Sequence, residues 1–165
     1  MQELLDNVPY LLMGVLGSAI ILLSIPDPLL GSCAAALYFI YCLAGALWVM
    51  LFVCPYCRFF DSRLCPCGYG QLAARLRKRG DEKLFARKFR RHIPVIVPLW
   101  FIPVIVGVVA LLRDFRLSLL VLVIVFAFNS FVVLPLLSRV YGCAHCSQKE
   151  DCPWMGGSKQ SGSDA

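Results

Sequence analysis

Seven of the nine cysteines in this chain stand in two groups, each close behind a long apolar segment. The first group has the spacing C-x2-C-x7-C-x-C, and its members are Cys54, Cys57, Cys65 and Cys67. Four thiolates are the complete ligand set of a structural zinc ion or of a cubane iron–sulfur cluster. Pro55 stiffens the turn of the first pair, and Gly68 and Gly70 permit close backbone approach behind the last cysteine. This pattern predicts a metal site.

The second group has the spacing C-x2-C-x5-C and supplies three thiolates, from Cys143, Cys146 and Cys152. A tetrahedral site needs one more ligand. His145, a water molecule or a sulfur of the first group could fill that position. The sequence therefore predicts one or two metal sites, and the first group can complete one alone.

Three kinds of chemistry fit these thiols. Zinc is favoured on ligand preference, because a closed structural site explains so many thiols without an obvious nucleophile. A [4Fe-4S] cluster is the alternative cofactor and would serve electron transfer to a membrane quinone. Thiol–disulfide exchange is the third, since Cys54-Pro55-Tyr56-Cys57 has the C-P-x-C form of a glutaredoxin active site. Such a redox motif normally opens a helix after a strand, whereas this one follows an apolar segment.

The order of the segments resembles that of the membrane palmitoyltransferases that carry an Asp-His-His-Cys motif. Those enzymes place a zinc-bearing, cysteine-rich cytoplasmic loop between the second and third of four spans, and Pro-Trp follows their motif, as it follows Cys152 here. Lys149-Glu150-Asp151-Cys152 lacks both histidines, however, and stands behind the fourth apolar segment. Because no histidine is there to activate the Cys152 thiol, we assign no catalytic residue and favour a non-enzymatic role.

Apolar residues make up 59% of the 165 positions, against roughly 45–50% in soluble domains. Four stretches without Asp, Glu, Lys or Arg approach or exceed the about 20 residues that a membrane-crossing helix needs; they are 8–25, 30–53, 93–112 and 117–137. These stretches predict an all-α, multi-pass integral membrane protein, with residues 1–155 as a single four-span domain. The short connections between the first two and the last two predict two helical hairpins.

Basic residues set the predicted orientation. Eleven of the sixteen lysines and arginines lie in residues 54–92, between the second and third spans, and three more follow the fourth span. The turns on the other side hold only Arg113 and Arg116. Because cationic loops stay on the cytoplasmic side during insertion, both termini, the loop 54–92 and the cysteine-rich tail 138–155 are predicted to be cytoplasmic. Stable disulfides are rare in that compartment.

The basic stretch 71–92 divides at Gly80 into two short amphipathic helices, and Asp81 is the expected N-cap of the second. Their apolar positions are Leu72, Leu76, Leu84, Phe85 and Phe89. Helices of this kind lie in the headgroup layer of anionic lipid. The predicted partners are therefore the lipid bilayer, anionic headgroups through 71–92 and a protein docked at the cytoplasmic face. No nucleic-acid partner is expected, because no nucleic-acid motif accompanies the charge.

Polar groups within the spans are few. Asn129 and Ser130 form a polar pair, and Asn129 is expected to face the other helices because a buried amide needs a partner. Cys33 and Cys42 are expected to act as small apolar side chains and not as ligands.

The third span contains Pro94, Pro98 and Pro103, each of which removes a helical hydrogen bond. Prolines are tolerated in membrane helices, and we expect no cavity from these three. Beyond the last cysteine group, residues 156–165 have the composition of a disordered tail.

Overall fold

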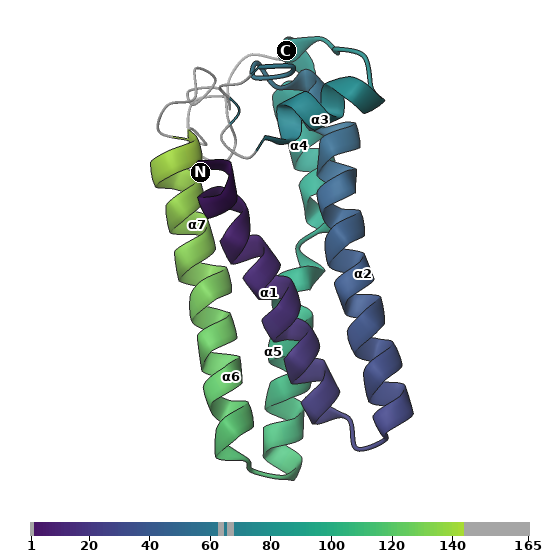
Figure 1. Ribbon diagram of the computed structural model, residues 1–165, viewed down its shortest axis with the longest axis vertical. Coiled ribbons are helices and arrows are strands. Elements are labelled where there is room, and N and C mark those ends of the chain that lie inside the picture. The colour runs from purple at the N-terminus through teal and green to yellow at the C-terminus, as the bar shows by residue number, and fades with distance from the viewer. Residues whose placement is uncertain (1, 63–64, 66–67, 144–165) are drawn as a thin grey trace, which may run out of the picture. The chain divides into compact units, whose positions relative to one another are not determined.

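The computed structural model of the chain describes residues 2–62, 65 and 68–143 (Figure 1). Helices are the only regular secondary structure among these residues, which confirms the all-α prediction. The chain divides into two compact units. The span unit comprises Asn7–Leu47 and Val95–Leu136, and the described part of the loop unit comprises residues 2–6, 48–62, 65, 68–94 and 137–143.

The long helices are α1 (Gln2–Ser24), α2 (Pro28–Phe52), α5 (Pro98–Arg113) and α6 (Leu117–Phe128). After α6 the chain stays helical through a π-helix (Asn129–Val133), α7 (Leu134–Leu137) and a second π-helix (Ser138–Cys143). Within the described residues, four helical runs are long and apolar enough to cross a membrane: Asn7–Ser24, Pro28–Tyr56, Glu82–Arg113 and Leu117–Val140. The four predicted apolar spans are therefore present as helices.

In the span unit, α1 packs closely on α2 because small residues face large ones. Gly17 lies against the ring of Tyr38, so close that a Cβ built on the glycine would be 2.5 Å from a ring carbon. The Tyr10 hydroxyl donates to the backbone oxygen of Cys42 at 2.7 Å, and the Ser18 hydroxyl reaches that of Ala35 at 3.3 Å. Such close contacts hold helices together in lipid, where no hydrophobic driving force favours their association.

The third span begins differently from the prediction. Residues 93–95 form a 3-10 turn, and the α-helix starts only at Pro98, not at Ile93. The first amides of α5 make the shorter 3-10 bonds, Leu99 to Ile96 and Trp100 to Val97, both at 3.1 Å. At about 1.5 Å per residue, the 16 residues of α5 cover roughly 24 Å and are shorter than a hydrocarbon core of about 30 Å.

Two tyrosines of α2 donate to the backbone oxygens that this proline-rich segment leaves without a helical partner. Pro103 has no N–H to give to the oxygen of Leu99, and the Tyr38 hydroxyl donates to that oxygen at 2.8 Å. The amide of Leu99 donates to the oxygen of Ile96, and the oxygen of Val95 therefore lacks its helical donor. The Tyr41 hydroxyl donates to this oxygen instead. At Pro103, α2 thus supplies the donor that the proline lacks.

This arrangement predicts a coupling between Tyr38 and Pro103. Tyr38→Phe should lower the free energy of unfolding by about 1–3 kcal/mol, because a buried carbonyl loses its donor. In a Pro103→Ala background the same change should cost close to nothing, since the alanine amide would donate to the oxygen of Leu99. Thermal unfolding of the four proteins in detergent measures the cycle. Equal costs of Tyr38→Phe in both backgrounds would contradict the assigned role.

Asn129 faces the other helices of the span unit, as predicted. Its side chain is buried, and its amide nitrogen donates to the backbone oxygen of Pro9 on α1 at 3.0 Å. The π-helix begins at this residue, and the Leu134 amide bonds to the Asn129 oxygen five residues back. The adjacent Ser130 is also buried, and its hydroxyl has no hydrogen-bond partner among the described residues.

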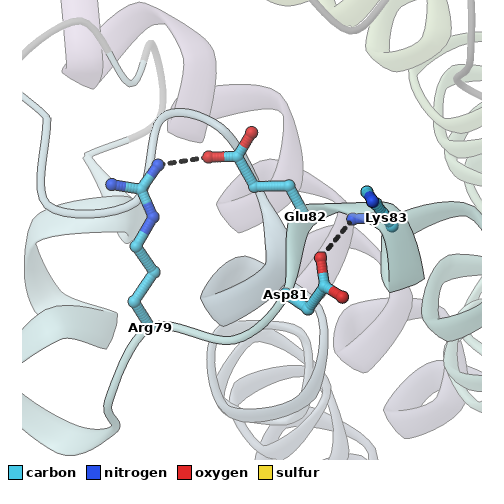
Figure 2. A network of polar contacts seen from close by, with 4 residues as sticks. All are labelled: Arg79, Asp81, Glu82 and Lys83. Carbon is cyan, nitrogen blue, oxygen red and sulfur yellow. Dashed lines mark hydrogen bonds and ion pairs between the residues drawn. The ribbon is translucent and has the colours of Figure 1, made fainter.

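The loop unit contains two short α-helices, α3 (Tyr69–Leu76) and α4 (Phe85–His92), and the 3-10 turns Cys54–Tyr56 and Glu82–Leu84. Figure 2 shows the turn between α3 and α4, where Arg79 and Glu82 form an ion pair. Asp81 accepts a hydrogen bond from the Lys83 amide at 3.0 Å, which confirms it as the cap of the helical segment that leads into α4. The helices therefore separate at Gly80, as the sequence predicted.

Candidate metal centre

The first cysteine pair lies on a tight turn that continues directly from α2. Cys54 to Tyr56 form a 3-10 turn, closed by a bond from the Cys57 amide to the Cys54 oxygen at 3.0 Å. Pro55 fits this turn because its position needs no amide donor. Cys57 follows the turn as its C-cap, in an extended backbone conformation. The tight turn predicted for the C-x2-C pair is therefore present.

Cys65 belongs to the same neighbourhood. Burial raises the pKa of the Cys54 thiol, and the neighbouring thiols of Cys57 and Cys65 raise it further. The Gly70 amide donates a hydrogen bond to the sulfur of Cys65 at 3.3 Å. All three thiols are partly buried, and none of them is in a disulfide. Cys65 thus lies at the start of α3, but the three described cysteines are not arranged as a metal-binding group.

Gly70 makes the close backbone approach predicted for it, whereas Gly68 serves a different purpose. Gly68 has a φ of 71°, a left-handed conformation that favours glycine, and it precedes the first residue of α3. A Cβ on Gly70 would lie 2.5 Å from the backbone oxygen of Phe59 and 3.2 Å from the Cβ of Cys65. Only glycine permits this approach without displacing the backbone.

The other predicted ligands fall largely outside the described residues. Cys67, His145, Cys146 and Cys152 are in that category, and Cys143 is described only as the end of the second π-helix. Within residues 2–62, 65 and 68–143, no group of three or more His, Cys, Asp or Glu side chains is arranged to hold a metal ion. The complete sites therefore remain predictions.

A cluster of aromatic rings at the end of α2 was not expected from the sequence. Phe52 and the imidazole of His92 stack with their centroids 5.1 Å apart, and Trp48 contacts both rings at 4.3 and 5.8 Å. The cluster joins the last turn of α2 to the last residue of α4. The signal in the sequence was the pair Trp48 and Phe52, four residues apart at the end of the second span, together with His92 at the end of the basic stretch 71–92.

The chain matches no protein-family model, no curated protein and no solved structure.

Cations surround the cysteine turn and are held on aromatic rings. Tyr56 is part of the cysteine turn, and the ammonium group of Lys88 lies 5.1 Å from the centroid of its ring. The guanidinium group of Arg77 lies 5.3 Å from the ring centroid of Phe52. Gly80 packs directly on Tyr56 and donates its amide to the Pro55 oxygen at 2.9 Å. The cysteine turn therefore lies among cationic and aromatic side chains.

Proposed function

We propose that Cys54, Cys57, Cys65 and Cys67 bind one structural zinc ion. The observation that carries the proposal is the hydrogen bond from Gly70 to the Cys65 sulfur, in a loop that begins with the tight turn at Cys54. Backbone amides that donate to metal-bound ligands fix their orientation and stabilise their charge. A site of four thiolates has no open coordination position, so the proposed role is structural and non-enzymatic.

The charge of the loop supports a site built from thiolates. Four thiolates around Zn²⁺ carry a net charge of −2, and the segment 54–92 holds eleven basic residues against three acidic ones. Arg77 and Lys88 come from two different helical segments and are both held over rings beside the cysteine turn. The metal would join the end of α2 to the start of α3 and so shape a docking surface.

The proposed setting is a membrane protein of two helical hairpins with the loop 54–92 and both termini in the cytoplasm. The bias of fourteen of sixteen basic residues to one side of the spans supports this orientation. The loop would contact anionic headgroups through 71–92 and offer its surface to a protein partner. A membrane-impermeant thiol reagent should label Cys57 only after cells are opened; rapid labelling of intact cells would reverse the orientation.

The second cysteine group is proposed as a further set of ligands. Cys143, Cys146 and Cys152 would take His145, a water molecule or a sulfur of the first group as their fourth ligand. The metal-to-protein ratio therefore distinguishes one bound ion from two.

Metal analysis of the full-length protein tests the proposal. Protein purified without oxygen should be colourless and contain at least one equivalent of zinc. Brown protein with iron and acid-labile sulfide would replace zinc by a [4Fe-4S] cluster and favour electron transfer. Protein that lacks both metals, and whose thiols cycle reversibly to a disulfide, would favour the thiol-redox role instead.

A further inference from the structure

Helix α3 carries its two leucines on the outside of the loop unit. Leu72 and Leu76 are 45% and 53% exposed, whereas Gly70 and Ala73 form the buried face. Residues four apart lie on one face of a helix, so the leucines form a single apolar strip one turn long. The sequence predicted this apolar line, and the structure shows that it does not face the interior of the loop unit.

The surroundings of this strip are cationic. Arg75 and Lys78 are exposed beside it. The nearby acidic residues are engaged in the turn before α4, where Glu82 pairs with Arg79 and Asp81 caps the amide of Lys83 (Figure 2). An apolar strip bordered by positive charge matches the headgroup layer of an anionic bilayer. The loop is also tethered to apolar spans at both of its ends, by α2 and by α5.

The cysteine site, which consists of Cys54, Cys57, Cys65 and Cys67, holds the first turn of α3 in place. The Gly70 amide donates to the Cys65 sulfur, and the Gly70 oxygen accepts from the Asp61 amide at 3.2 Å. At the other end, Arg77 lies over Phe52 and Gly80 bonds to Pro55. A helix of eight residues is too short to be stable alone. Its shape and its orientation therefore depend on these contacts.

We propose that α3 is a docking helix for the surface of an anionic bilayer, with Leu72 and Leu76 inserted between headgroups, and that the cysteine site controls this docking. With metal bound, Cys65 and Gly70 hold the leucines in one outward orientation. With the metal lost, the first turn of α3 is released and the leucines no longer act together. The second part of this proposal rests on the metal site proposed above.

Hydrogen exchange of the full-length protein in nanodiscs tests the docking. Nanodiscs of phosphatidylcholine alone are compared with nanodiscs that also contain phosphatidylglycerol. In the metal-bound protein, amides of residues 70–79 should exchange about tenfold more slowly on the anionic discs, because the docked helix opens less often. High salt should reduce the difference, since it screens the attraction. Exchange at α6 serves as the check that the fold is intact.

Two variants separate the parts of the proposal. Leu72→Ser combined with Leu76→Ser should remove the lipid dependence and leave the metal content unchanged. Gln71→Ser, an exposed change on the same helix, is the matched control and should keep the dependence. Gly70→Ala retains every cysteine but places a Cβ 2.5 Å from the Phe59 oxygen, so it should displace α3 and weaken docking.

Stripping the metal with a chelator gives the final comparison. The lipid dependence should disappear; if it persists, the cysteine site does not control docking. Metal-bound protein without any lipid dependence would overturn the docking helix and leave the zinc proposal standing. Protein that binds no metal would overturn the control by metal, and the two nanodisc types would then decide on docking alone.

Discussion

Protein in which Cys54 and Cys57 are both replaced by serine should lose its zinc entirely and unfold at a markedly lower temperature. The two cysteines stand at the two ends of a single 3-10 turn, and their replacement leaves two of the four proposed ligands. Structural zinc contributes on the order of 10 kcal/mol to the folding of small metal-binding domains. Metal content and a thermal melt of the purified protein measure both effects.

Cys33→Ser is the matched control for this experiment. Cys33 is an exposed thiol of α2, the helix that precedes the turn. Its replacement should leave metal content unchanged, which excludes a general effect of losing a cysteine. Full zinc occupancy in the double variant would contradict the proposed ligand set. If the double variant kept its fold but lost reversible thiol oxidation, Cys54 and Cys57 would serve redox chemistry instead of zinc binding.

Gly17→Ala should lower the free energy of unfolding by about 1–3 kcal/mol, the range for overpacking in a close-packed interior. The new Cβ would lie 2.5–2.7 Å from three atoms of the Tyr38 side chain. That ring cannot withdraw freely, because it is buried and its hydroxyl is bonded to the oxygen of Leu99. The substitution therefore also weakens the bond that supports the proline-rich third span.

Gly14→Ala on the same helix is the comparison. A Cβ at position 14 would meet Phe39 and Cys42 at 3.5–3.7 Å, which is ordinary van der Waals contact. This variant should unfold within about 0.5 kcal/mol of the native protein, and its extra helix propensity can stabilise it. Thermal unfolding in the same detergent compares the two variants. Equal stability of the two would show that α1 and α2 do not pack as closely as described.

The four apolar spans could be predicted from the sequence because length and the absence of charge are properties of each segment alone. The start of the third span could not. Pro94, Pro98 and Pro103 are visible in the sequence, but their effect depends on the hydroxyls of Tyr38 and Tyr41, which lie more than fifty residues away in the chain. Donors supplied by another helix cannot be inferred from local pattern.

The same distinction applies to the candidate metal centre. The turn at Cys54 and the close approach at Gly70 follow from local residue types, and both are present. The contacts of Gly80 with Tyr56 and of His92 with Phe52 join segments that are distant in sequence, and they were missed. The apolar line on α3 was predicted correctly, but its direction was decided by the small residues Gly70 and Ala73 on the opposite face.

The bond between Tyr38 and the oxygen left by Pro103 has an evolutionary consequence. A relative of this protein that keeps a proline at position 103 should keep a hydrogen-bond donor at position 38. A relative with an ordinary residue at 103 is free to carry phenylalanine there. The two positions should therefore change together among homologues, although 65 residues separate them in the chain.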